Sequence, residues 1–347
     1  MRRYAAALLA ALLAAGCAAP KPAPGGARHH YLFAYFEGNG DGLHLAYGTD
    51  GLHWRALNGD RPFLRPAVGA EQLMRDPMVL HGPDGLFHLV WTTGWGLAKP
   101  DGQDHGVRDM GYASSPDLIH WSAQQDIPVM AQEPTARNAW APELFRDDRA
   151  GLYLVFWSST IPGRFPATDG QLRKGRSWDP GWDHRIYFTT TRDFHAFAPT
   201  RLLYDPGFNV IDATMARAGH RFLMFVKDET DDPFPPQKHI RMAVATSPQG
   251  PWGAASPPIT GAYRAEGPTV LKIGETWYVY FDRYEDHRFG LVVSEDLVHW
   301  RDASDRLSMP AGMRHGTALE VSDAVARDLL ALEGAGAAAG LRGGATP

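Results

Sequence analysis

The chain repeats one pattern five times: a run of strand-forming residues that ends in a turn cluster and an aromatic residue. The five copies are AYGTDGLHW (46–54), GYASSPDLIHW (111–121), YFTTTRDFHAF (187–197), MAVATSPQGPW (242–252) and GLVVSEDLVHW (290–300). Repeated units that each hold several short strands are typical of a β-propeller. The sequence therefore predicts an all-β fold, a five-bladed β-propeller.

A second series follows the first, because a strand that opens with a polar residue comes after each copy. Asp76 and Glu143 each lie 22 residues after the aromatic residue (76 − 54 and 143 − 121). Asp212, Glu266 and His315 lie 15, 14 and 15 residues after it (212 − 197, 266 − 252 and 315 − 300). If these five positions are equivalent, their side chains converge on one mouth of the central channel.

The repeats also predict how the ring closes. Blades are expected at about 74–123, 139–198, 208–253 and 264–301. The first unit, 31–56, lacks an inner strand of its own, and residues 314–321 are expected to supply it. This pairing of the two chain ends would remove an open sheet edge. We thus expect one domain over 31–321, then a short helix from 322 and a disordered tail over 334–347.

The N-terminus has the features of an export signal. Two arginines precede an Ala/Leu run that is too short to span a bilayer, and the run ends at Cys17. Residues 1–17 resemble a bacterial lipoprotein signal whose Cys17 is lipidated, and 18–30 form a Pro/Gly linker. An ordinary cleaved signal with an incidental cysteine is the alternative. Lipidation would give a membrane-anchored protein on the periplasmic or cell-surface side.

Composition and missing motifs exclude several functions. The net charge of −5, without any block of Lys and Arg, argues against nucleic acid as a partner. Signatures of nucleotide binding, zinc peptidases and serine hydrolases do not occur. The fifteen histidines are scattered, which argues against a transition-metal site. We expect a monomer that requires no cofactor.

The carboxylates suggest glycoside hydrolysis. Asp76 lies on the second blade and Glu266 on the fifth, so the two would face each other across the channel, with Asp212 next to Glu266. Inverting hydrolysis needs two carboxyl groups about 6.5–9.5 Å apart, one to activate water and one to protonate the leaving oxygen. Asp76 is then the expected base and Glu266 the acid. Asp212 would raise the proton affinity of Glu266 and orient it.

The remaining candidates surround this set. Glu143 is a rival for the acid role, or else a ligand for sugar hydroxyls or a structural partner. His315 is either a satisfied histidine of the channel floor or a contact to an ion or to the sugar. Loops 94–109, 160–185, 228–239 and 283–289 are expected at the same mouth, with 161–185 as a substrate wall or, alternatively, a solvated loop. The further residues expected to bind substrate are Arg75, Trp95, Trp140, Trp157 and Arg283.

Five motifs in order, RDPMVL, NAWAPEL, NVIDATM, AEGPTV and RHGTAL, resemble those of glycoside hydrolase family 43. The similarity covers about 31–321. It implies a five-bladed β-propeller and inverting exo- or endo-hydrolysis of arabinose- and xylose-containing glycans, and of galactose units in some members. By resemblance the base falls on Asp76, the pKa-modulating aspartate on Asp212 and the acid on Glu266. His315 falls where many members hold a calcium ion through water.

Three functions remain open at this point. The first is an exo-acting α-L-arabinofuranosidase or β-D-xylosidase. The second is a galactofuranosidase, or a retaining fructosidase-like hydrolase of the same propeller class. The third is a surface lipoprotein that binds glycan without cleaving it.

Overall fold

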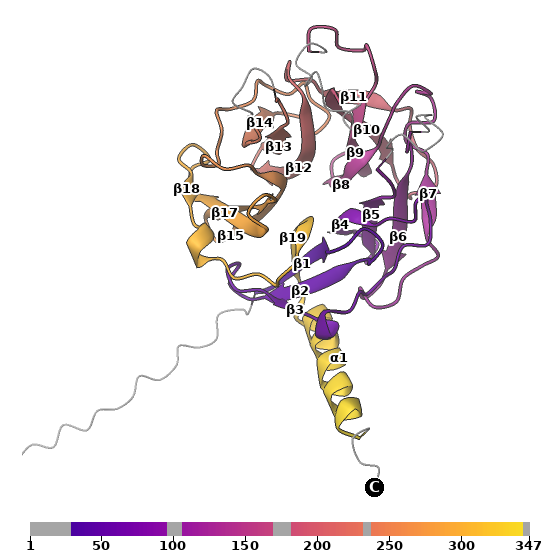
Figure 1. Cartoon of the computed structure of the whole chain (residues 1–347), viewed down its shortest axis with the longest axis vertical. Coiled ribbons are helices and arrows are strands. Elements are labelled where there is room, and N and C mark those ends of the chain that lie inside the picture. Colours follow the sequence, from indigo (N-terminus) through magenta and orange to yellow (C-terminus); the bar gives the residue numbers. More distant parts are fainter. Residues whose placement is uncertain (1–28, 96–105, 169–181, 232–236, 343–347) are drawn as a thin grey trace, which may run out of the picture.

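The computed structural model describes residues 29–95, 106–168, 182–231 and 237–342. Within them, five antiparallel sheets stand around a central axis, as Figure 1 shows. This confirms the predicted five-bladed β-propeller. Cys17 and most of the predicted signal and linker lie outside the described residues, as does the middle of the 161–185 loop.

The blades follow one another along the chain, and four of them have four strands. Blade 1 holds β19 (Arg314–Val321), β1 (His30–Phe36), β2 (His44–Gly48) and β3 (Arg55–Ala56). Blade 2 holds β4 (Arg75–His81), β5 (Phe87–Thr92), β6 (Met110–Ser115) and β7 (Gln125–Ile127). Blade 3 holds β8 (Trp140–Asp147), β9 (Leu152–Thr160), β10 (His184–Thr191) and β11 (Arg201–Tyr204). Blade 4 holds β12 (Val210–Ala218), β13 (Arg221–Asp228) and β14 (Ile240–Ala245), and blade 5 holds β15 (Glu266–Ile273), β16 (Thr276–Arg283), β17 (Arg288–Ser294) and β18 (Arg301–Asp302).

The ring closes as predicted. Strand β19 pairs antiparallel with β1, with Leu319 opposite Leu32. The innermost strands β19, β4, β8, β12 and β15 contact one another in that circular order. Blade 1 therefore lies between blades 2 and 5, and it is built from both ends of the domain.

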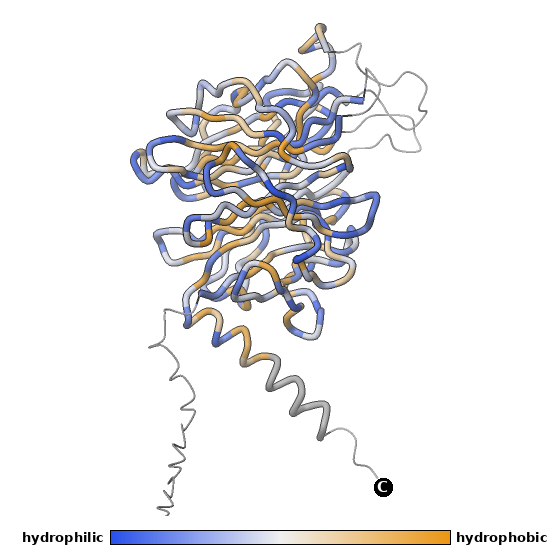
Figure 2. Tube along the Cα trace, turned by 90° about the vertical axis from the view of Figure 1, so that its left-hand side faces the viewer, coloured by the Kyte–Doolittle hydropathy of each residue, from blue (hydrophilic) through white to orange (hydrophobic). Residues whose placement is uncertain are grey.

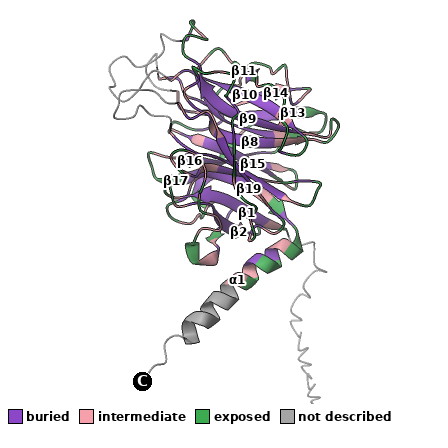
Figure 3. Cartoon of the chain, turned by 90° about the vertical axis from the view of Figure 1, so that its right-hand side faces the viewer, coloured by how far each residue is buried: buried purple, intermediate pink, exposed green. Residues whose placement is uncertain are grey.

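Five apolar clusters hold the blades together, one between each neighbouring pair. Along β13, Leu223 and Phe225 pack with blade 5, whereas Met224 and Val226 pack with blade 3. Successive side chains of a strand point to opposite faces, so a strand between two blades must be apolar on both faces. Figure 2 shows the apolar stretches along the stacked strands, and Figure 3 shows the same strands buried, with the exposed residues mainly in loops.

The repeated turn motif forms the blade corners. Asp117 Oδ1 accepts hydrogen bonds from the backbone N–H groups of Ile119 (2.9 Å) and His120 (2.8 Å), and Oδ2 lies 2.7 Å from His120 Nδ1. Leu118 between them has a φ of 66°. Asp50 with His53 and Asp296 with His299 repeat this arrangement. The histidines of these motifs are thus architectural.

The C-terminal helix is longer than the sequence indicates. Helix α1 spans Asp323–Arg342, which includes residues expected to be disordered. Ala326 and Leu329 enter the cluster between blades 1 and 2, and the rest of the helix projects from the body in Figure 1. Two short 3-10 helices, η1 (Asn58–Asp60) and η3 (Ser304–Arg306), complete the elements cited below. In the described part of the chain, none of the helices has the length and apolarity needed to cross a membrane.

Candidate active site

Each innermost strand carries a bulge at the same place. In all five, the pairing with the second strand is interrupted across four consecutive residues: Arg75–Met78, Trp140–Glu143, Ile211–Thr214, Glu266–Thr269 and Arg314–Thr317. The second residue has a positive φ in four of them: Asp76 (51°), Ala141 (47°), Asp212 (53°) and Gly267 (57°). Such φ values are uncommon outside glycine and are often found at functional sites. A bulge re-aims side chains, and here it turns them toward one end of the channel.

The five polar residues do not occupy equivalent positions in the bulges, as the sequence had predicted they would. Asp76, Asp212 and His315 occupy the second position of the motif, whereas Glu266 occupies the first and Glu143 the fourth. The single shared register was therefore wrong. Spacing from the preceding aromatic residue could not show this, because the loops between the corner and the inner strand differ in length.

A belt of contacts links the blades at this level. A residue near the end of each second strand reaches the bulge of the next blade. The Phe36 ring centroid lies 4.7 Å from the Arg75 guanidinium, and Thr92 and Ser158 accept from the backbone N–H of Ala141 (2.9 Å) and Asp212 (3.1 Å). Lys227 donates to Glu266 (2.9 Å), and Asp282 accepts from Arg314 (2.6 Å).

Asp76 is held as a carboxylate. The Thr92 hydroxyl donates to Oδ2 (2.8 Å), and His315 Nδ1 lies 3.2 Å from Oδ1. Burial alone would raise the pKa of Asp76, but the hydrogen bond and charge of His315, together with Arg75 and Thr92, lower it to about 2. Its side chain keeps 12% exposure, so a water molecule can reach an ionised base.

His315 is the positive centre of the channel. Burial by itself would lower its pKa, but the hydrogen bond to Asp76 and the charges of Asp76, Asp212 and Glu143 raise it to about 9. An imidazolium therefore supplies the positive charge that the carboxylates require. Among the described residues, the one group of three side chains placed to hold a metal ion consists of Glu37, His44 and Asp60, and it does not include His315. The calcium ion of the channel stays a prediction.

Glu266 stands between two cations. Lys227 Nζ donates to Oε2 (2.9 Å), and Arg314 Nη2 lies 3.2 Å from Oε1. Lys227 is 3% exposed and also pairs with Glu229 (2.7 Å). Burial would lower the pKa of Lys227, but Glu229 and Glu266 raise it well above its ordinary value. Glu266 keeps 20% of its side chain exposed, which leaves it accessible from the mouth.

Asp212 differs from its predicted role in one respect. Its Oδ2 accepts from the backbone N–H of Gly267 (3.0 Å), the residue after Glu266, so it does orient that strand. Burial raises the pKa of Asp212 to about 6, against the opposing charges of His315 and Lys227. The sequence predicted extra proton affinity for Glu266, and that part stays a prediction. A raised pKa of Asp212 itself was not predicted, and its cause is burial.

Glu143 is enclosed rather than presented to solvent. It is 3% exposed, and the Thr214 hydroxyl donates to its Oε2 (2.9 Å). Burial raises the pKa of Glu143 to about 8, although His315 and the Thr214 hydrogen bond oppose the change. Glu143 thus has a proton to give at neutral pH but little access. Of the two rival acids, Glu266 is the one that a substrate can reach.

An aromatic wall adjoins Asp76. The Arg75 guanidinium lies 4.2 Å from the ring centroid of Trp95, which packs edge-on against Trp140 (5.5 Å). Trp182 lies 4.6 Å from Trp140 and stacks on His184 at 5.5 Å. Three residues predicted to bind substrate therefore come together here. Trp182 and His184 both lie within 161–185, the range predicted as a substrate wall, although the structure places His184 at the start of β10 and no signal in the sequence singles it out.

Two other predicted substrate-binding residues lie apart from this wall. Trp157 is completely buried in the apolar cluster between blades 2 and 3, so its assignment to the substrate site was wrong. Its place in the alternation of β9 turns it toward the core. Arg283 pairs with Asp286 and lies 4.0 Å from the Tyr263 ring centroid, both in blade 5 or next to it. Its role with substrate stays a prediction.

Comparisons with known proteins identify a family and a fold. A family model related to glycoside hydrolase family 43, described as a probable glycosyl hydrolase domain, matches residues 27–326. An α-L-arabinofuranosidase of Bifidobacterium longum subsp. longum is 26% identical over 166 residues, which are 45% of this chain and 15% of that entire enzyme. The chain thus spans only a small part of that relative.

Solved structures show the same fold at low identity. The GH43 BlXynB protein from Bacillus licheniformis matches with a TM-score of 0.53 and 12% identity, over 82% of this chain and 54% of that one. An exo-β-1,3-galactanase from Phanerochaete chrysosporium matches with a TM-score of 0.51 and 12% identity, over 75% and 55%. An α-L-arabinofuranosidase from Lactobacillus brevis matches with a TM-score of 0.50 and 16% identity, over 67% and 72%.

Proposed function

This chain belongs to the glycosyl hydrolase domains related to glycoside hydrolase family 43, and we propose that it is an inverting, exo-acting glycosidase for arabinose- or xylose-containing glycans. That it is a glycosidase follows from the family; the stereochemistry, the exo action and the sugar are the proposal. One observation carries it: two accessible carboxylates, each held by cationic partners, flank one strand of blade 1.

The geometry suggests a role for each carboxylate. Asp76, ionised and within reach of solvent, takes a proton from the water that attacks the anomeric carbon. Glu266, which must enter the step protonated, gives that proton to the leaving oxygen as the glycosidic bond breaks. Asp76 then holds a proton and Glu266 is ionised, and loss of the proton from Asp76 to solvent and uptake of one by Glu266 restore the pair. Asp212, through the Gly267 N–H, keeps the bulge that carries Glu266 in place.

Strand β19 separates the pair. His315 contacts Asp76 and the preceding residue, Arg314, contacts Glu266, while the two carboxylates come from the blades on either side. An inverting pair must leave space for both a sugar and a water molecule. Carboxylates on either side of an intervening strand are compatible with that need, whereas a retaining pair would have to be closer.

The proposal for the sugar rests on the aromatic wall and on a sequence relative. The Trp95–Trp140–Trp182 wall offers flat apolar faces of the kind that pack on sugar rings. The sequence relative in Bifidobacterium is an arabinofuranosidase, but one structural neighbour is an exo-β-1,3-galactanase. Galactosides therefore belong in any test, and we place them second.

The test is a panel of aryl glycosides and glycans assayed with the full-length protein. Aryl α-L-arabinofuranoside, β-D-xyloside, galactofuranoside and β-galactoside would be compared for the wild type, Asp76→Asn and Glu266→Gln. We expect Glu266→Gln to lose about 10²–10⁴-fold on a natural oligosaccharide but far less on a substrate with a good leaving group. Asp76→Asn should lose activity on both. Glu275→Gln, which changes an exposed ion pair with Lys272 at the far end of β15 from Glu266, is the matched control.

Three results would contradict parts of the proposal. Unchanged hydrolysis by Glu266→Gln on every substrate would remove the acid assignment. Retention of the anomeric configuration, observed by NMR of the first product, would remove inversion. Specific binding of a glycan without turnover by the wild type would favour the non-catalytic alternative.

We also propose, from the sequence, that the protein is exported and anchored through a lipid on Cys17. The Ala/Leu run and the lone cysteine support this. Metabolic labelling with a fatty acid analogue should mark the wild type and not Cys17→Ser; equal labelling would contradict it.

A further inference from the structure

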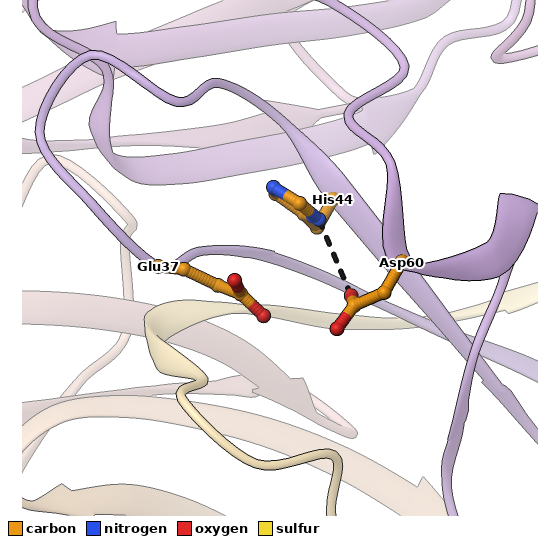
Figure 4. Close-up of side chains that lie close together, drawn as sticks. All are labelled: Glu37, His44 and Asp60. Carbon is orange, nitrogen blue, oxygen red and sulfur yellow. Dashed lines mark ion pairs between the residues drawn. The ribbon is translucent and has the colours of Figure 1, made fainter.

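A second cluster of polar side chains lies in blade 1, apart from the carboxylates described above. Glu37 follows the end of β1, His44 begins β2 and Asp60 ends η1. One ligand-type atom from each lies within 4.8 Å of those of the other two. Figure 4 shows the carboxylates of Glu37 and Asp60 facing each other, with the His44 ring beside them.

The histidine of this cluster is buried and only half satisfied. His44 is 2% exposed, and its Nε2 lies 2.6 Å from Asp41 Oδ2. Its Nδ1 has no hydrogen-bond partner and points toward Asp60, with 3.4 Å between Nδ1 and Oδ1. Buried polar atoms without a partner are rare in folded proteins and call for an explanation.

Glu37 also has a buried polar atom without a hydrogen-bond partner. Glu37 Oε1 is buried and has no hydrogen-bond partner. Asp60 receives one hydrogen bond from the Tyr35 hydroxyl (2.7 Å). Three carboxylates, counting Asp41, thus surround one imidazole. Asp41 also pairs with Arg65, but that side chain is 68% exposed and its Nη1 lies 3.6 Å from Asp41 Oδ1.

We propose that Glu37, His44 and Asp60 bind a divalent transition-metal ion of the zinc class. One imidazole nitrogen and two carboxylate oxygens form a donor set that Zn²⁺ accepts, with water in a fourth position. Asp41 would then be the outer carboxylate that orients the imidazole, an arrangement common around metal-bound histidines. The scattered histidines of the sequence argued against a transition-metal site. That argument missed this cluster because it holds a single histidine, and its other two ligands are carboxylates that only the fold brings together.

The position of the cluster suggests a structural role for a bound ion. Glu37 and His44 bracket the loop that contains Asn39. Asn39 Oδ1 accepts from Arg75 (2.8 Å), and its carbonyl accepts from the Met74 N–H (2.8 Å). A metal ion would fix this loop and, through Asn39, the Arg75 side chain next to Asp76. This role goes beyond the glycosidase proposal and does not depend on it.

A protonated His44 that bridges Asp41 and Asp60 is the competing explanation. It would satisfy both ring nitrogens without an ion, and Glu37, whose pKa is raised by burial and by Asp60, would share a proton with Asp60. The two explanations differ in what Glu37→Gln does to zinc binding. It removes a metal ligand in the first case, whereas in the second it replaces a carboxyl group that binds no ion.

The experiment is metal binding by chelator-treated, full-length protein. Zn²⁺, Mn²⁺, Ca²⁺ and Mg²⁺ would be titrated by calorimetry, with metal content measured after dialysis and unfolding followed by circular dichroism. We expect one Zn²⁺ per chain and a higher Tm in its presence. Glu37→Gln and Asp60→Asn should lose at least tenfold in affinity, and Asp41→Asn about 10–100-fold.

The controls separate this site from stray binding. Asp296→Asn alters an exposed His–Asp pair and should bind Zn²⁺ like the wild type. Because histidines 29 and 30 could also bind zinc, their double replacement by Gln serves as a second control and should keep the stoichiometric site. Wild-type protein without stoichiometric Zn²⁺, or folded Glu37→Gln with unchanged affinity, would overturn the proposal.

Discussion

Replacing His315 with Gln tests how the active site keeps Asp76 ionised. The pKa of Asp76 is about 2, against an ordinary 3.8, although burial acts in the opposite direction. At 1.36 kcal/mol per pKa unit, this difference corresponds to roughly 2 kcal/mol of net stabilisation of the carboxylate. In His315→Gln the burial remains while the imidazolium is lost. The pKa of Asp76 should therefore rise above 3.8, a change on the order of two pH units or more.

The assay is the pH profile of kcat/KM on an aryl glycoside with a good leaving group, since such a substrate needs little proton donation. The acidic limb of the profile should move upward by about two pH units in His315→Gln. His315 also lowers the pKa of Asp212 and Glu143, so neighbouring carboxyls shift in the same direction. His299→Gln, at an exposed corner, should superimpose on the wild type. Superimposed wild-type and His315→Gln profiles would refute the reasoning.

Three further predictions concern stability. Lys227→Met removes the buried cation that Glu229 and Glu266 share and leaves them Lys238 and Arg314, so it should lower the free energy of unfolding by about 1–3 kcal/mol in urea titrations, against less than about 0.5 for the exposed Lys272→Met. A Cβ at Gly111 would lie 2.0 Å from the indole ring of Trp91 on β5, so Gly111→Ala should lower the free energy of unfolding by about 1–3 kcal/mol or more. In the control Gly40→Ala, the added Cβ meets nothing within 4 Å, and equal Tm values of the two variants would contradict this packing. The raised pKa of His315 stabilises the fold fully below about pH 6.5, and this contribution should fade as the pH rises through about 9. Urea titrations across that window should show a larger loss in the wild type than in His315→Gln, in which Glu143, with a pKa of about 8 or higher, still titrates.

The blades were predictable because their signal is local. Four of the five corners use an aspartate that accepts from the backbone of the turn, the fourth uses Ser247, and each strand between two blades must be apolar on both faces, so these features recur in the sequence. The closing strand was predictable by elimination, since 31–56 lacked an inner strand and 314–321 had no other partner. These inferences use only properties of single strands and turns.

The contacts between blades were not predictable in the same way. Lys227, Asp282 and Arg314 act on residues of a neighbouring blade, and the bulges decide which side chains meet. A signal was nevertheless present. In LFHLVWTT (86–93), LYLVFWSS (152–159), RFLMFVKD (221–228) and TWYVYFDR (276–283), the seventh residue is polar after an apolar run, and all four of these residues belong to the belt.

The belt also explains why closure of the ring and assembly of the site are the same event. Both carboxylates assigned to the chemistry depend on β19, because His315 contacts Asp76 and Arg314 contacts Glu266. Strand β19 is positioned by its pairing with β1, almost three hundred residues earlier in the chain. Until those two strands pair, neither carboxylate has this partner. The strand that removes the open edge of the propeller thus also brings the charges that prepare its active site.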